Sequence, residues 1–302
     1  AVLARDGRAA RAALRRELSA LHALALGRLV TTVLQRSTAA LGCCGTGAWE
    51  CCPLRGPAPL SGNSRPCYPA NALRQASLGL VRSRLVMIAD VDLLPSPGLA
   101  ESLQDGAGHL LADGAGGDPF FLVVPAFQLA RSERCEERPE ADEAASAAQV
   151  SSLLRGDLAA ARERLCELSR RGEAALFHAA SCPAGHGPTD LSRWQEAGQG
   201  PEPVYGVRWA EGYEPYGLAE RSRLPCFDER FDAYFRHDKS SFFAELAHSG
   251  WVFAALRRGF LLDRPHAARA AVAPPVRAAA NGLMRRKFRE ARCARRLARL
   301  AA

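Results

Sequence analysis

One short stretch constrains the fold more than any other. The apolar run from Leu85 to Ala89 has the length of a buried strand, and it stops at two carboxylates, Asp90 and Asp92. Pro97 then stands where it can open a helix. We therefore expect a buried strand that delivers both carboxylates to the end of a sheet, which is where ligands bind in open α/β proteins.

The spacing of the two aspartates suits a divalent cation. Mg²⁺ and Mn²⁺ prefer carboxylate oxygens, and one or two protein carboxylates together with substrate phosphates can complete the shell of such an ion. The triplet is therefore typical of a metal–diphosphate site. Two solvated turn aspartates would give the same triplet, so the pair alone does not decide between these interpretations.

Composition sets the broad class of the protein. The 302 residues are 48% hydrophobic, enough for the core of one large domain or two small ones. The net charge is +8, but lysine occurs only at Lys239 and Lys287, so nearly all the positive charge is arginine. This bias weakens the case for a phosphate-binding surface, and no recognition motif accompanies the charge. We expect no nucleic-acid partner.

Membrane and redox signals are limited. No stretch reaches the roughly 18 apolar residues of a membrane span, and the start does not resemble a signal peptide. The chain begins with alanine rather than methionine, and we expect it to be a fragment. Four of the ten cysteines are crowded into residues 43–44 and 51–52, without clear disulfide pairing or zinc spacing. An oxidising secretory compartment is compatible with this count.

Helical and strand-like patterns alternate along the first half of the chain. Residues 1 to about 40 have leucines at helical spacing, which favours an amphipathic packing helix over a membrane-surface helix. Asn71 is placed to cap a helix whose apolar face continues to Val81. Residues 97–112 indicate another helix, and residues 120–127 another buried strand. This alternation is typical of a doubly wound α/β fold.

The second half is less regular. Residues 139–171 form a helical tract that we expect to break near Gly156. A polar loop then enters a turn capped by Asp or Thr, and its His186 is expected to be a hydrogen-bonding residue rather than a ligand. Residues 213–216 and 227–232 mix aromatic and acidic side chains, which suits carbohydrate but also an ordinary sheet–helix boundary.

A series of motifs then occurs in a fixed order. It consists of Tyr68 to Arg74, Asp90 to Leu99, Val123 to Phe127, Gly185 to Trp194, Tyr213 to Tyr216 and Phe227 to Phe231. The series closely resembles glycosyltransferase family 49, the LARGE-like and β-1,4-glucuronyltransferase-like enzymes, over roughly residues 66 to 268. The ordered set is far more specific than any one of its motifs.

The resemblance implies a GT-A-like (Rossmann-like) glycosyltransferase domain with a helical N-terminal segment. It also implies a UDP-sugar donor, xylose or glucuronic acid, and inverting transfer to a glycan or glycoprotein acceptor with Mn²⁺ or, alternatively, Mg²⁺. Such enzymes are typically type II membrane proteins of the Golgi lumen, so a membrane anchor is expected outside this sequence.

The resemblance also assigns roles to individual residues. Asp90 and Asp92 match the acids that hold metal and nucleotide, and His266 is a third candidate metal ligand. Asn71 and Arg74 are implied in cofactor binding. An inverting transfer needs a carboxylate that takes a proton from the acceptor hydroxyl. Asp238 is the first candidate for this base, with a purely structural role equally open, and Glu214 is the second candidate.

Three departures from the family pattern bear on activity. Residues 233–237 replace a glycine-rich turn with a bulkier one, which could narrow the acceptor pocket or shift the base. Asp263 stands where the family usually has the first of two histidines. No clear strand–turn–helix precedes Tyr68 to hold the uridine, although Leu29–Leu34 is a candidate strand.

These observations predict three regions and leave two functions open. Residues 1–65 would form an N-terminal region, for which an incomplete nucleotide-binding half is one interpretation. Residues 66–268 would form the GT-A-like domain, and residues 269–302 would form a linker with a basic helix. That helix is expected to pack on the domain rather than bind an acidic polymer. The first function is a metal-dependent glycosyltransferase. The alternative is a catalytically degenerate relative that binds glycans or serves as an interaction module.

Overall fold

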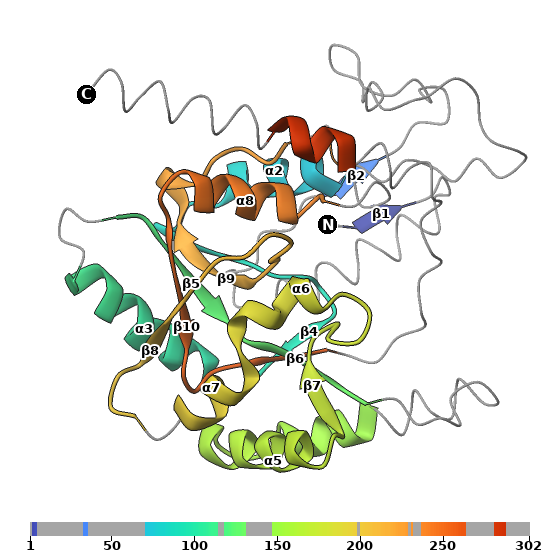
Figure 1. Ribbon diagram of the computed structural model, residues 1–302, viewed down its shortest axis with the longest axis vertical. Coiled ribbons are helices and arrows are strands. Elements are labelled where there is room, and N and C mark those ends of the chain that lie inside the picture. Colours follow the sequence, from blue (N-terminus) through green and yellow to red (C-terminus); the bar gives the residue numbers. More distant parts are fainter. Residues whose placement is uncertain are drawn as a thin grey trace, which may run out of the picture. The chain divides into compact units, whose positions relative to one another are not determined.

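The computed structural model describes residues 2–4, 33–35, 70–113, 118–130, 147–197, 200–228, 231, 237–263 and 281–287 (Figure 1). The chain divides into two compact units. The first comprises residues 1–83, 225–242 and 271–302, and the second comprises residues 84–224 and 243–270. The boundary between Phe242 and Phe243 falls inside helix α8 (Ser240–His248).

A five-stranded mixed sheet forms the centre of the second unit. Its strands are β3 (Leu85–Ile88), β9 (Tyr216–Glu220), β5 (Phe120–Val124), β10 (Val252–Leu256) and β8 (Val204–Val207), in this spatial order. β5 and β10 are parallel, and β9 runs antiparallel to both β3 and β5. β8 is antiparallel to β10. The expected α/β class is confirmed, with antiparallel strands interleaved among three that share one direction.

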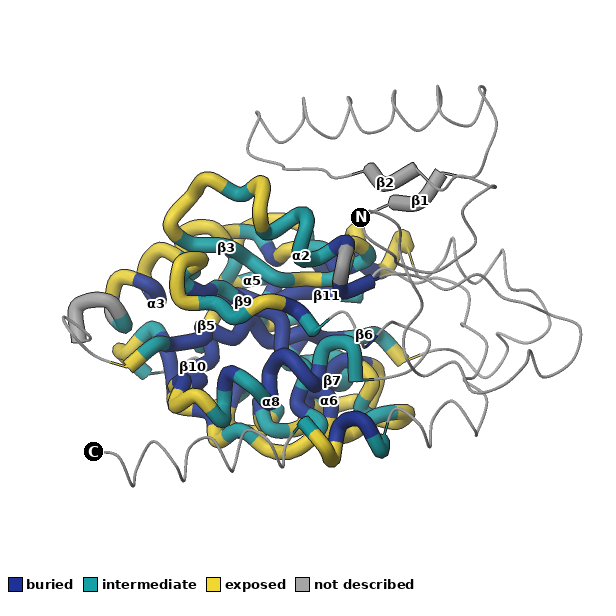
Figure 2. The backbone as a smooth tube through the Cα atoms, turned by 90° about the horizontal axis from the view of Figure 1, so that it is seen from above, coloured by how far each residue is buried: buried dark blue, intermediate teal, exposed yellow. Residues whose placement is uncertain are grey.

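β3 is not the buried strand that its apolar sequence predicts. All four of its residues are half-buried, whereas all five residues of β5 are buried (Figure 2). Among the described strands, β3 pairs with β9 alone and so lies at the edge of the sheet. The prediction was wrong because a continuous apolar run reports hydrophobicity and not the position of a strand within its sheet.

A second, four-stranded sheet belongs to the same unit. Its strands are β4 (Leu93–Pro95), β11 (Leu261–Asp263), β6 (Ala126–Leu129) and β7 (Ala174–Leu176), in this order. The single strand predicted over residues 120–127 is divided at Pro125 into β5 and β6, which belong to different sheets. Proline has no N–H for a sheet ladder, so the break at this residue has a direct cause.

The helices of the second unit follow the sequence closely. α3 (Leu99–Asp113) confirms the helix predicted over residues 97–112. Residues 147–153 and α5 (Leu158–Arg170) are separated at Gly156, whose φ of +84° favours glycine. The side chain of Asp157 caps α5 by accepting the N–H of Ala160 at 2.8 Å. The remaining helical elements are α6 (Pro183–His186), η2 (Gly187–Thr189), α7 (Leu191–Ala197) and η3 (Arg221–Arg223).

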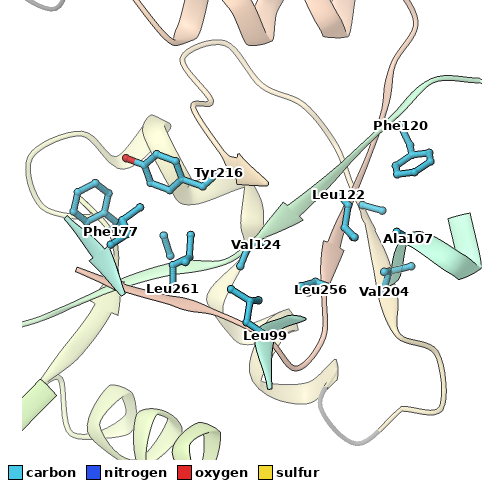
Figure 3. Packing of buried hydrophobic residues seen from close by; sticks show 13 residues of the cluster. Leu99, Ala107, Phe120, Leu122, Val124, Phe177, Val204, Tyr216, Leu256 and Leu261 are labelled. Atoms are coloured by element: carbon cyan, nitrogen blue, oxygen red, sulfur yellow. The ribbon is translucent and has the colours of Figure 1, made fainter. Parts of the chain in front are cut away.

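The hydrophobic core cluster of this unit packs α3 against the five-stranded sheet and continues to the four-stranded sheet at Leu93, Ala126 and Leu261 (Figure 3). Leu122 and Val124 of β5 pack there with Leu256 of β10. Successive residues of a strand face opposite sides, so Phe121 lies on the other face, edge-on to Phe243 of α8 at 5.1 Å between ring centroids. Both faces of β5 are therefore buried by packed side chains.

In the first unit the N-terminal prediction is corrected at two places. β1 (Val2–Ala4) and β2 (Val33–Gln35) are short parallel strands, not parts of an amphipathic helix. β2 overlaps the end of the candidate strand Leu29–Leu34. The helical periodicity failed here because valine and leucine also fit a strand. The rest of residues 1–40 lies outside the described residues, as do the four crowded cysteines.

Two helices of the first unit test further predictions. α2 (Ala70–Leu80) forms as expected, but Asn71 lies inside the helix instead of capping it, so that prediction was wrong. Residues 281–287 are helical, and Leu283 and Met284 are buried, which supports the packing role expected of the basic C-terminal segment. Among the helices that the structure describes, none is long and apolar enough to span a bilayer.

Candidate active site

The two aspartates lie in the turn that joins β3 to β4. The N–H of Leu93 donates to the carbonyl of Asp90 at 3.4 Å, which closes this turn. Asp90 and Asp92 are half-buried, and Val91 between them is 87% exposed. Both aspartates therefore follow the end of β3, as the sequence predicts.

Tyr216 orients the first of these carboxylates. Its hydroxyl donates to Oδ2 of Asp90 at 2.7 Å, while the tyrosine side chain itself is fully buried. Phe177 lies beside it, with 6.1 Å between ring centroids, at one end of the core cluster (Figure 3). The ring of His186 also packs against Tyr216, with 5.1 Å between ring centroids. Asp90 is thus held by an aromatic residue from a different strand.

His186 is not the loop residue that the sequence predicts. It ends α6, is buried, and contacts the rings of both Phe177 and Tyr216. The following turn is capped by Asp190, whose Oδ1 accepts the N–H of Arg193 at 3.1 Å, so aspartate rather than threonine is the cap. The segment predicted as a polar loop is a run of short helical turns that packs against the core.

Glu214 lies next to these turns. Its N–H donates to the carbonyl of Gly185 at 2.8 Å, and the residue is half-buried. Tyr213 before it is fully buried and exchanges a 2.8 Å hydrogen bond with the hydroxyl of Thr189. Burial raises the pKa of the Tyr213 hydroxyl, against a smaller opposing effect of its Thr189 hydrogen bond. The backbone of Glu214 is therefore fixed by its neighbours.

The residues present suit a hard divalent cation in part. Two carboxylates at one turn supply oxygen ligands of the type that Mn²⁺ and Mg²⁺ prefer. Asp263 lies opposite Leu93 in the antiparallel pair β4–β11. Leu93 is the residue that follows Asp92 in the chain. Within the described part of the chain, no three His, Cys, Asp or Glu side chains are grouped to hold a metal. His266 lies outside the described residues, so its role stays a prediction.

A second group of predicted site residues lies in the first unit. Arg74 donates through Nη1 to Oδ2 of Asp238 and to Oδ1 of Asn71, both at 2.8 Å. Nδ2 of Asn71 donates to the backbone carbonyls of Asp228 and Asp238 at 2.9 and 3.0 Å. The structure therefore joins Asn71, Arg74 and Asp238 in one network that links α2 to Asp228 and Asp238.

The helix at residues 281–287 supports the same network. Nζ of Lys287 lies 3.2 Å from Oδ2 of Asp228. Both ring nitrogens of His237 have partners, Oγ of Ser240 at 2.9 Å and Oδ1 of Asn281 at 2.8 Å. Asp238, the first candidate base, thus follows a residue that is fixed from two sides.

Sequence reasoning placed Asp90 and Asp92 correctly at a strand end but did not single out Tyr216. The motif containing Tyr216 was interpreted as a mixture of aromatic and acidic residues and as part of the family series, with no role assigned to Tyr216 itself. Its hydrogen-bond partner is 126 positions away along the chain. The buried end of β9 gave no local signal that this hydroxyl would reach a carboxylate.

Comparison with known proteins identifies the family. Residues 49–294 match the family model described as "Glycosyl-transferase for dystroglycan". The chain belongs to this family. The matched span includes both predicted site groups, those around Asp90 and those around Asp238.

Individual relatives within this glycosyltransferase family are similar over 65–67% of the chain. Mouse β-1,4-glucuronyltransferase 1 is 31% identical over 202 residues, which is 65% of this chain and 40% of the relative. Human xylosyl- and glucuronyltransferase LARGE2 is 31% identical over 203 residues, 67% of this chain and 24% of the relative. The chain therefore spans less than half the length of the curated relatives it matches.

Proposed function

We propose that this chain carries a glycosyltransferase domain that moves xylose or glucuronic acid from a UDP-sugar to a glycan acceptor with inversion. The observation that carries the proposal is the acid pair Asp90 and Asp92 at the end of β3, in a chain that matches the family over residues 49–294. The donor sugars are those in the names of the similar proteins. The mixed sheet is compatible with the GT-A-like fold that the proposal includes.

Asp90 and Asp92 would hold a divalent cation, Mn²⁺ or Mg²⁺, with His266 as the third protein ligand. When bound, the cation supplies a Lewis acid that offsets the charge developing on the leaving UDP. The hydroxyl of Tyr216 keeps Oδ2 of Asp90 in a fixed direction, so one carboxylate is preorganised before the donor arrives. This arrangement favours the enzyme over a pair of solvated turn residues.

The proton of the acceptor hydroxyl requires a carboxylate. Asp238 remains the first candidate, although one of its oxygens is paired with Arg74 at 2.8 Å. This contact equally suits a structural role in which Asp238 holds α2. Glu214 is the second candidate, with a backbone fixed by Gly185. Asn71 and Arg74 would act on the nucleotide only if donor binding rearranges the network that they form with Asp238.

The decisive experiment measures UDP release from a panel of UDP-sugars with glycan acceptors. Each reaction is run once with Mn²⁺ and once with EDTA in place of the metal. Asp92→Asn should abolish metal-dependent release. Asp105→Asn is the matched control because it removes one carboxylate from an exposed position of α3. Absence of turnover and of UDP binding in the folded wild-type chain would reject the transferase for this chain.

The base is tested by two further variants. If Asp238 takes the proton, Asp238→Asn should lower kcat by about 10²-fold or more while UDP binding persists, and Glu214→Gln should leave kcat nearly unchanged. The reverse pattern would move the role to Glu214. A loss of folding in Asp238→Asn would assign Asp238 to the structural network instead.

The alternative function is a degenerate module that binds glycans without catalysis. It is favoured by Asp263 at a position where the family usually has histidine. The module predicts glycan binding that EDTA does not change. The proposed enzyme would act in the Golgi lumen from a membrane anchor outside this sequence, and localisation of the full-length protein by microscopy would test that expectation.

A further inference from the structure

We infer that Tyr216 is a positioning residue for Asp90, and that metal binding by the acid pair depends on its hydroxyl. This inference rests on the proposed function, because it concerns the same acid pair. Tyr216 would not touch the sugar or the metal. It would act only through the carboxylate that it holds at 2.7 Å.

The backbone fixes where this tyrosine lies. Tyr216 is the first residue of β9 and pairs with Val124 of the fully buried strand β5. The next residue, Gly217, pairs with Ile88, the last residue of β3. The sheet register therefore sets Tyr216 beside the point where β3 ends and the turn with Asp90 and Asp92 begins.

The side chain is fixed as firmly as the backbone. Tyr216 has no exposed surface, and the rings of Phe177 and His186 pack against it at 6.1 and 5.1 Å. A ring held in this way cannot change rotamer without opening the core. The direction of its hydroxyl is therefore a property of the folded sheet.

The carboxylate, in contrast, lies in a turn that is partly exposed. Asp90 is half-buried and precedes Val91, which is 87% exposed. A half-exposed aspartate in a turn has several accessible rotamers. A hydrogen bond from a hydroxyl to a charged carboxylate is stronger than one between neutral groups, so Tyr216 selects among those rotamers. Groups that orient a metal ligand in this way typically change metal affinity about 10- to 100-fold when they are removed.

The chain offers a closely matched control. Tyr213 is also fully buried, lies three positions earlier, and its hydroxyl bonds at 2.8 Å to the neutral side chain of Thr189. Tyr213→Phe and Tyr216→Phe therefore remove the same atom from equally buried rings. They differ in whether a carboxylate of the acid pair loses a hydrogen bond.

The test measures Mn²⁺ binding directly, from the loss of the free-ion signal in electron paramagnetic resonance titrations of the folded chain. Tyr216→Phe should raise the dissociation constant about 10-fold, and Tyr213→Phe should change it less than twofold. In an Asp90→Asn background, Tyr216→Phe should have no further effect, because its route to the metal has been removed.

Several results would overturn the inference. Equal Mn²⁺ affinity in wild type and Tyr216→Phe would do so. Equal losses of Mn²⁺ affinity in Tyr216→Phe and Tyr213→Phe would do so as well. An undiminished effect of Tyr216→Phe in the Asp90→Asn background would also exclude the proposed route. A Tyr216→Phe chain that fails to fold while Tyr213→Phe folds would assign the hydroxyl to the fold instead. A wild-type chain that binds no Mn²⁺ would instead reject the metal site of the proposed function itself.

Discussion

Gly217 of β9 should tolerate no side chain, and the reason is the close approach of two strands. A Cβ atom built on Gly217 would lie 2.1 Å from the carbonyl oxygen of Leu122 and 2.9 Å from its carbonyl carbon. Both atoms belong to the backbone of β5, all of whose residues are buried. Relief of this clash requires β5 or β9 to move, because no rotamer change can provide it.

The size of the stability loss in Gly217→Ala follows from which atoms must move to relieve the clash. Overpacking a core costs about 1–3 kcal/mol when side chains can adjust. Here a backbone ladder must shift, so Gly217→Ala should lower the free energy of unfolding by about 3 kcal/mol or more. For a unit of this size, that loss corresponds to a fall in Tm of roughly 6–12 °C. Because Tyr216 precedes Gly217, the orientation of Asp90 should be disturbed as well.

Gly206→Ala is the matched control. Gly206 lies in β8 of the same sheet, and a Cβ built there would meet no atom within 4 Å. Glycine inside a strand costs about 0.5–1 kcal/mol relative to alanine, so this variant should melt at or slightly above the wild-type temperature. Differential scanning calorimetry of both variants checks the prediction. If Gly217→Ala melted within about 2 °C of wild type, the two strands would separate freely and the argument would fail.

Two further predictions concern stability in other parts of the chain. Lys287→Met should lower the free energy of unfolding by about 2–3 kcal/mol, because it removes the ion pair between Lys287 and the carboxylate of Asp228, whose side chain is 11% exposed. Arg286→Gln removes an exposed charge from the same helix and should have little effect on the free energy of unfolding in urea. Equal losses in the two variants would contradict the reasoning. Burial raises the pKa of the hydroxyls of Tyr205 and Tyr213 above the ordinary value of about 10. As the pH rises above about 10, these hydroxyls lose their protons in the unfolded chain but keep them in the folded chain. The free energy of unfolding therefore falls as pH rises. Tyr213→Phe should therefore reduce the slope of stability against pH above pH 10 by about 1.4 kcal/mol per pH unit, as urea midpoints would measure, and an unchanged slope would refute the assignment.

Much of the local structure could be predicted because its causes are local. Helix α3 follows from the spacing of its apolar residues after Pro97. The break at Gly156 follows from a φ of +84° that glycine adopts readily, and Asp157 then supplies a helix cap. The placement of Asp90 and Asp92 after a strand also needs only the neighbouring residues.

Predictions failed where the outcome depends on distant partners. Asn71 looked like a helix cap, yet its side chain bridges the carbonyls of Asp228 and Asp238, more than 150 positions away. The apolar run of β3 looked like a central strand, yet it pairs with one described strand and is half-buried. The sequence offers no local signal for the position of a strand in its sheet.

By itself the sequence determined that two carboxylates follow β3 and, through the order of its motifs, the family. An apolar run favours a strand and the carboxylates end that run, so the neighbouring residues alone place both aspartates after β3. Only the tertiary structure decided that the hydroxyl of Tyr216 would hold Asp90. That contact arises from the register between β3, β9 and β5, which is set by the packing of all three strands.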